Sequence, residues 1–213
     1  RMLIFRDYKN IPTNYKGSVI AIGNFDGIHK GHKYILEVAR KKINSKNIKM
    51  AVLTFEPHPI KILRPSDWKN RLVKFRTKTR LLKSMGIDAV FALRFNLKLS
   101  KLRARDFLQE IIINNLEASR IVVGDDFRFG FKREGDVSLL KEYSNKGSFS
   151  VDVIEKKLID SNICSSTIIR NLILRGNVKE AYAYLGYFWE VEGRVIHGDS
   201  RGRQLGFPTA NLN

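Results

Sequence analysis

The chain has 213 residues, of which 43% are hydrophobic and 10% aromatic. This composition supports a packed core and excludes an intrinsically disordered protein, and the length allows one large domain or one domain with part of another. The formal net charge of +18 often accompanies nucleic-acid binding. The basic residues are nevertheless spread along the whole chain, and we interpret their densest stretch, 61–83, as a solvated helix face.

The sequence contains no apolar run that approaches the roughly 18 residues of a membrane span. Residues 1–10 lack the long apolar region of a signal peptide. The single cysteine, Cys164, excludes an internal disulfide and is consistent with a reducing compartment. We therefore expect a cytoplasmic protein without a membrane partner.

The first elements describe a strand, a tight turn and a helix. Residues 3–16 predict an edge strand or arm followed by a loop at Pro12, and V-I-A-I at 19–22 predicts a buried parallel strand. Gly23 and Gly27 then bracket a turn in which glycine permits unusual backbone angles. A helix from about 31 to 43 is predicted by apolar residues at helical spacing, namely Tyr34, Ile35, Val38 and Ala39.

This arrangement suits phosphate binding. Free backbone N–H groups and the positive end of the helix dipole point at an anion placed beyond the strand. Gly31 has no side chain, so we expect a nucleotide to lie close to the backbone there.

Two histidines add to the prediction of a phosphate site. His29 and His32 are three residues apart and share one face of the first helical turn. Such imidazoles can donate hydrogen bonds to the charge that builds as a P–O bond breaks. The alternatives are a surface pair or half of a metal site, but the nearby sequence offers only Asp26 as a further zinc ligand.

The next segments extend the same fold. Met50 to Phe55 predicts a second buried strand and completes a parallel strand–helix–strand unit. The loop Glu56-Pro57-His58-Pro59 follows that strand and should face the same crevice as the Gly23 turn. Further elements are expected as a helix ending at Gly86, a strand at 89–95, an amphipathic helix at 105–114 and a strand at 120–123.

Residues 124–136, G-D-D-F-R-F-G-F-K-R-E-G-D, describe a ligand loop after a strand, and the alternative is a hairpin rich in glycine and aspartate. Phe127 and Phe129 are expected to pack the loop.

A strand is predicted at 150–158, followed by a helix with Ser165 or Ser166 as its N-cap. Helix continues to 185 with a break at Gly176-Asn177, and Gly186 ends it.

From Tyr187 the sequence alternates with frequent glycine, which predicts an antiparallel strand and loop. We therefore divide the chain at this point, into a domain over 2–185 and a second unit over 186–213.

Five segments together support a resemblance. They are G-N-F-D-G-I-H-K-G-H, T-F-E-P-H-P, G-D-D-F-R-F-G, S-S-T-I-I-R and G-F-P-T-A-N. H-x-G-H after a buried strand is typical of nucleotidyltransferases, and the five segments in this order resemble the bacterial riboflavin kinase/FMN adenylyltransferase family, also called FAD synthetase. The resemblance implies an α/β, Rossmann-like nucleotidyltransferase domain with a parallel sheet, followed by a fragment of an antiparallel β-barrel.

The implied reaction transfers the adenylyl group of ATP to FMN, giving FAD and pyrophosphate, with Mg²⁺ as the cofactor. Riboflavin would be a further substrate, and its phosphorylation is expected only of a chain that extends beyond Asn213. The remaining alternatives are another H-x-G-H adenylyl- or cytidylyltransferase and a basic RNA-binding module. Nucleic acid is the less favoured partner, and a homo-oligomer stays open.

The resemblance also implies residue roles. Phosphate-side catalytic residues would be His29, His32, Ser165, Ser166, Thr167 and Arg170. ATP would contact Gly23, Asn24, Phe25, Asp26, Gly31, Gly124, Asp125 and Asp126. The flavin would lie near Glu56, Pro57 and His58, and the kinase magnesium near Thr209 and Asn211. Cys164 departs from the aliphatic residue usual in the family before the S-S-T segment.

Overall fold

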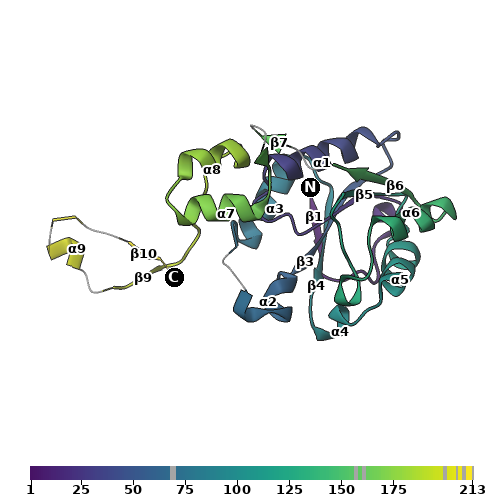
Figure 1. The fold of residues 1–213 in the computed structure, drawn as a ribbon, viewed down its shortest axis with the longest axis horizontal. Coiled ribbons are helices and arrows are strands. Elements are labelled where there is room, and N and C mark those ends of the chain that lie inside the picture. Colours follow the sequence, from purple (N-terminus) through teal and green to yellow (C-terminus); the bar gives the residue numbers. More distant parts are fainter. Residues whose placement is uncertain are drawn as a thin grey trace.

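The computed structural model describes residues 1–67, 71–155, 158–159, 162–198, 201–204, 206–207 and 210–212. Its centre is a six-stranded sheet in the order β1-β4-β3-β2-β5-β6, in which every neighbouring pair is parallel (Figure 1). The strands are β1 Leu3–Phe5, β2 Val19–Ile22, β3 Met50–Glu56, β4 Ala89–Arg94, β5 Arg120–Gly124 and β6 Ser150–Ile154. The predicted α/β class, the edge strand and the parallel strand–helix–strand unit are confirmed.

Both faces of the sheet are covered, which explains why its strands have continuous apolar sequences. In β2, Val19 and Ala21 pack in one cluster with residues of α1 Lys30–Lys41 and α3 Phe75–Ser84. Ile20 and Ile22 join the opposite cluster, which contains residues of α6 Val137–Asn145 and of the helical segment 104–116. Successive residues therefore alternate between two apolar layers.

The strand order sets the position of a ligand crevice. From β2 the sheet grows through β3 and β4 in one direction, and through β5 and β6 in the other. Ligands of such sheets bind beyond the carboxyl ends of the strands where the order reverses. Here that position is between β2 and β5, next to the Gly23 turn and the Gly124 loop.

Two predicted elements differ from the structure. The helix expected at 105–114 is α5 Ala104–Asp106 continued by η3 Phe107–Asn115, a π-helical segment that buries four apolar residues, Phe107, Leu108, Ile111 and Ile112. The strand expected at 150–158 ends at Ile154, because its partner β5 ends at Gly124 in register with it. Beyond it, β7 Leu158–Ile159 pairs antiparallel with β8 Asn162–Ile163.

The loop expected at 56–59 is shorter than predicted, because Pro59 begins α2 Pro59–Leu63. Proline is tolerated there, since the first turn of a helix needs no backbone N–H donor from it. The remaining short elements are η1 Thr13–Tyr15, η2 Pro65–Asp67, α4 Leu97–Ser100 and η4 Phe131–Arg133.

The C-terminal part begins with two packed helices, α7 Ser166–Leu174 and α8 Val178–Leu185. Gly186 ends α8 with a φ of 71°, so the predicted break and end are confirmed. Beyond it, β9 Val195–Ile196 pairs antiparallel with β10 Asn211–Leu212, with α9 Arg201–Gln204 between them. Figure 1 shows this last segment extending away from the sheet. The antiparallel pairing agrees with the expectation, while the barrel and the domain boundary stay predictions.

Among the described residues, no helix combines the length and apolarity needed to cross a membrane.

Candidate active site

The turn after β2 is anchored in the core. Phe25 and Ile28 are 1% and 0% exposed and pack under α1. Both have positive φ, 48° and 40°, which is uncommon for residues with a side chain and tends to occur at functional sites. Gly27 has a φ of 86°, and a Cβ there would lie 2.7 Å from Leu72. The expected role of glycine is therefore confirmed at Gly27, whereas Gly23 has no positive φ.

The two histidines form a stacked pair at the start of α1. Their ring centroids are 3.6 Å apart with an interplanar angle of 21°. The backbone N–H of His32 donates to Nδ1 of His29 at 3.3 Å, so His29 caps the helix and a neutral ring carries its proton on Nε2.

Both histidines are held neutral at pH 7. Burial lowers the pKa of His29 to about 4. Burial, together with neighbouring His29 and Lys78, lowers the pKa of His32 well below its ordinary value. Nδ1 of His32 is enclosed without a hydrogen-bond partner among the described residues. Buried polar atoms without partners are rare in native structures and require an explanation.

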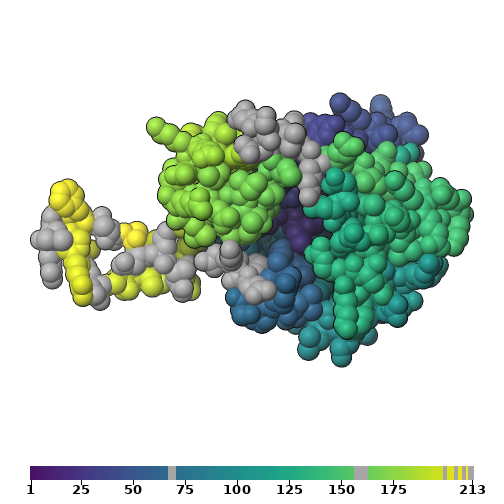
Figure 2. Space-filling view, in the orientation of Figure 1, coloured from purple at the N-terminus to yellow at the C-terminus, as the bar shows by residue number. Residues whose placement is uncertain are grey.

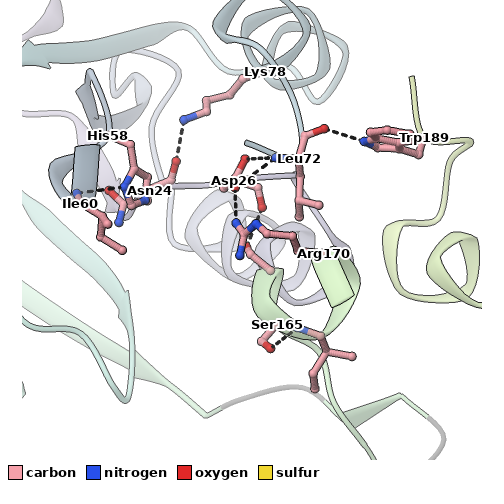
Figure 3. A network of polar contacts seen from close by, with 11 residues as sticks. Asn24, Asp26, His58, Ile60, Leu72, Lys78, Ser165, Arg170 and Trp189 are labelled. Atoms are coloured by element: carbon pink, nitrogen blue, oxygen red, sulfur yellow. Dashed lines mark hydrogen bonds and ion pairs between the residues drawn. The ribbon is translucent and has the colours of Figure 1, made fainter. Parts of the chain in front are cut away.

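Asp26 connects three parts of the chain (Figure 3). Its carboxylate accepts from the backbone N–H of Leu72 at 3.1 and 3.3 Å and from Nη2 of Arg170 at 2.8 Å. Its backbone carbonyl accepts from Oγ of Ser166 at 2.7 Å. The residue is 6% exposed. Asp26 therefore holds the turn, the segment before α3 and the first turn of α7 together.

The N-terminus of α7 packs directly against the histidine turn. Ser165 caps the helix by accepting from the backbone N–H of Ile168 at 3.4 Å, so the first of the two predicted N-caps is confirmed. Sγ of Cys164 lies 3.4 Å from Nδ1 of His29. A Cβ on Gly31 would lie 3.3 Å from the carbonyl oxygen of Cys164. A side chain at Gly31 would therefore crowd His29 and the start of α7, and the contact of Gly31 with a nucleotide stays a prediction.

The predicted flavin residues lie beside the predicted nucleotide residues. Glu56, at the end of β3, forms a bidentate pair with Arg71 at 2.7 and 2.9 Å. His58 accepts from the backbone N–H of Ile60 at 3.2 Å and so caps α2. Burial lowers the pKa of His58 to about 4. Nearby cations lower this pKa further, whereas Asp26 raises it. Pro57 joins these two residues in the chain.

Lys78 is a site residue that the sequence interpretation missed. It is 3% exposed, and its Nζ donates to the carbonyl of Asn24 at 2.6 Å (Figure 3). Reading 61–83 as a solvated face is therefore wrong at this position. Its spacing could have revealed it, because Lys78 is four residues before buried Leu82 and so shares its helix face.

The loop after β5 reaches the same edge of the sheet. Asp125 and Asp126 are exposed, and the backbone N–H of Asp125 donates to the carbonyl of Ile154 at 2.9 Å. Phe129 is buried and its ring lies 5.3 Å from that of Phe127, which confirms that these aromatics pack the loop. The alternative also holds in part, because Phe129 and Gly135 form an antiparallel bridge. A Cβ on Gly124 would lie 3.8 Å from Ile35 of α1, next to the turn.

Residues 187–192 contribute contacts that the sequence did not indicate. Nε1 of Trp189 donates to the carbonyl oxygen of Leu72 at 2.7 Å. The hydroxyl of Tyr187 donates to the carbonyl oxygen of Gly27. Further contacts join Glu192 to Thr77 at 3.0 Å and Glu190 to Arg80 at 2.5 Å. The segment after α8 is therefore attached to the same turn and segment that hold Asp26.

Figure 2 shows a hollow between the α7–α8 part and the loops after β5, with the purple of the chain's first residues at its base. A separate cavity of about 500 Å³ is lined by Arg103, Ala104, Arg105, Asp106, Glu134 and Leu139, none of them a predicted site residue. The described residues contain no group of three or more His, Cys, Asp or Glu that could hold a metal. Of the predicted kinase-side residues, Thr209 lies outside the described residues and Asn211 belongs to β10.

Two family models match the chain. The FAD synthetase model matches residues 11–168 and the riboflavin kinase model matches residues 185–213. The chain is also 40% identical over 212 residues to the bifunctional riboflavin kinase/FMN adenylyltransferase of Buchnera aphidicola subsp. Acyrthosiphon pisum, covering 99% of this chain and 67% of that protein. It is 36% identical to the protein of the same name from Escherichia coli K12, covering 99% and 68%.

Solved structures agree on the fold. A crystal structure titled as a macrolide-efflux protein from Streptococcus pneumoniae has a TM-score of 0.84 and 34% identity, covering 100% of this chain and 68% of that one. A pantoate-beta-alanine ligase from Francisella tularensis has a TM-score of 0.51 at 12% identity, covering 91% of each chain, and shares the fold alone.

Proposed function

The chain belongs to the family of bifunctional riboflavin kinase/FMN adenylyltransferases and carries their FAD synthetase domain, and from this premise we propose that the crevice between β2 and β5 joins FMN to the adenylyl group of ATP. One observation carries the proposal. The histidine turn, the start of α7 and the loop after β3 meet around Asp26 at the edge where such sheets bind ligands.

The reaction brings two anions together. The phosphate of FMN attacks the α-phosphorus of ATP, and pyrophosphate leaves. FMN phosphate is anionic at neutral pH, so no strong general base is required, and catalysis rests on positioning and electrostatic stabilisation.

The histidines act as neutral donors in this scheme. Because burial keeps the pKa of His29 near 4, the ring supplies an Nε2–H hydrogen bond and no positive charge. His32 supplies a second imidazole, and the lack of a partner for its Nδ1 among the described residues supports a functional role. Gly23, Asn24, Phe25 and Asp26 shape the turn that receives the ATP phosphates.

The start of α7 forms the opposite side of the phosphate site. Ser165, Ser166 and Thr167 would donate hydroxyls, and Arg170 would neutralise charge during transfer. Arg170 and Ser166 both donate to Asp26. ATP phosphates would therefore compete with Asp26 for the same donors, which couples substrate binding to a movement of α7.

The acceptor side consists of Glu56, Pro57 and His58, and we propose that the flavin lies against them. Gly124, Asp125 and Asp126 would contact the ribose or base of ATP. Magnesium would enter as the MgATP complex, because phosphate oxygens are ligands that Mg²⁺ prefers. Riboflavin phosphorylation would belong to the region that begins at residue 185, with Thr209 and Asn211 at its magnesium.

The test is incubation with MgATP and FMN, with the flavins resolved by chromatography and a parallel reaction on riboflavin. We expect FAD from FMN, and the riboflavin reaction shows whether the same protein also phosphorylates riboflavin. A folded protein that makes no FAD would contradict the proposal, and pyrophosphate release with another phosphate-bearing acceptor would favour a different nucleotidyltransferase.

A further inference from the structure

Lys78 stands apart from the other cations of the described residues. It alone among their lysines and arginines is buried, at 3% exposure, whereas Lys74 and Lys83 of the same region are exposed. A buried ammonium group is costly unless it is paired. Its hydrogen bond goes to a main-chain carbonyl, that of Asn24, and within the described part of the chain no carboxylate lies at salt-bridge distance from it.

The charged groups around Lys78 include more cations than carboxylates. The charged groups that act on Lys78 or His58 are three cations, Lys78, Arg71 and Arg170, and two carboxylates, Asp26 and Glu56. Each carboxylate is already bound to an arginine. The three histidines nearby carry no charge at pH 7, because burial lowers the pKa of each. Among the described residues, Lys78 is therefore the cation of this group that has no carboxylate at salt-bridge distance.

We propose that Lys78 is a positioning residue of the adenylyl-transfer site, which fixes the Asn24 carbonyl and supplies a positive charge that draws substrate phosphate to the turn. The inference rests on the proposed function. The bond to Asn24 ties α3 to the turn at the carboxyl end of β2 (Figure 3). The charge acts on His32 of the histidine turn and on His58 of the loop after β3, so it lies near both predicted substrate sides.

The state of this charge depends on pH. Burial lowers the pKa of Lys78 to about 8. The groups that face it are Asp26 of the turn, Glu56 at the end of β3, Arg71 before α3, and the rings of His32 and His58. The two histidines stay neutral through this range, because burial lowers the pKa of each, and the charge of Lys78 is lost as the pH rises through about 8.

The experiment titrates the full chain with inorganic pyrophosphate by calorimetry, alongside FAD formation and thermal unfolding. Lys78→Met removes the charge at similar volume, Lys78→Arg keeps it, and Lys83→Met on the exposed face is the control. We expect Lys78→Met to weaken pyrophosphate binding about tenfold at pH 7. Its unfolding midpoint should be unchanged or higher, because burying an apolar chain is less costly than burying a charge. Lys78→Arg, which keeps the charge, should retain more of the affinity than Lys78→Met, and Lys83→Met should bind like the parent.

A pH series completes the test. Parent affinity should fall as the pH rises through about 8, relative to Lys78→Arg, which corrects for the titration of pyrophosphate itself. Unchanged affinity in Lys78→Met, or a loss matched by a lower unfolding midpoint, would overturn the proposal. If Lys78→Met does not fold, parallel pH curves for the parent and Lys78→Arg overturn it instead. A parent that makes no FAD would contradict adenylyl transfer, while the pyrophosphate titration would still decide the role of Lys78.

Discussion

The 23–29 turn and the N-terminus of α7 face each other across the candidate site, but they are held in different ways. The turn is part of the sheet core, with Phe25 and Ile28 fully buried under α1. The start of α7 belongs to a smaller cluster and is joined to the turn by polar contacts, Arg170 and Ser166 to Asp26 and Cys164 to His29.

The difference separates two roles. Apolar burial fixes the turn in one geometry, because moving it would open the core. Arg170 and Ser166 can donate to phosphate oxygens in place of Asp26, because phosphate accepts strong charge-assisted hydrogen bonds. We therefore regard the turn as the fixed side of the site and α7 as the side that adapts to substrate.

The largest expected effect follows from the fixed side. His32→Ala should lower kcat for FAD formation by about 10²-fold or more, on the scale of losing one preorganised donor. The exposed His197→Ala is the matched control and should keep the parent rate. A His32→Ala rate equal to the parent rate would remove this histidine from the mechanism.

Acid should destabilise the fixed side through its buried histidines. The pKa of His29 is about 4 in the folded chain against 6.5 for an ordinary histidine, so between these pH values the unfolded chain binds a proton that the folded one does not. The free energy of unfolding should therefore fall as the pH drops from 6.5 to 4, by about 3 kcal/mol from His29. Urea unfolding at several pH values in this range measures the decrease. The variant His29→Gln should show a smaller dependence of the free energy of unfolding on pH. A parent curve as flat as that of the variant would contradict the assignment.

Asp26→Asn tests the connection between the two sides. It removes the charge that holds Arg170 and weakens the bond from Leu72. The free energy of unfolding should fall by about 2 kcal/mol, the scale of hydrogen bonds to a charged group. Asp125→Asn, on the exposed loop, should unfold like the parent. Equal stability of Asp26→Asn and the parent would mean that the contacts to α7 contribute nothing.

The smallest effect concerns the segment after α8. Trp189→Phe removes the hydrogen bond to the carbonyl of Leu72 while keeping an aromatic ring. The loss should be about 1 kcal/mol in the free energy of unfolding. Phe188, 80% exposed, offers a control in Phe188→Leu. Identical denaturation curves for Trp189→Phe and the parent would count against attachment of this segment to the site.

The same contrast explains what the sequence could predict. The strands at 19–22 and 50–55 were predictable because burial on both faces leaves an uninterrupted apolar run. The histidine turn was predictable because all its parts are local in sequence. The π-helical form of 107–115 was not, because the apolar spacing that predicts a helix there does not distinguish the two helix types.

The connections around Asp26 join residues distant in sequence. Leu72 is 46 residues away and Arg170 is 144 residues away, so no local pattern reveals that they share one carboxylate. Lys78 was misjudged although a local signal existed, because it lies four residues before the apolar Leu82 on the same helix face. A basic stretch is normally interpreted as solvent-exposed, and the tertiary structure shows that one of its residues is buried.

A double-mutant cycle on FAD formation tests most directly whether the two sides form one catalytic site. We would measure kcat for the parent, His32→Ala, Arg170→Gln and the double variant. The account predicts that the double variant is slower than the slower single variant by no more than about threefold, because groups that act as a unit are strongly non-additive. Losses that multiply fully, or a single variant with the parent rate, would contradict a shared site.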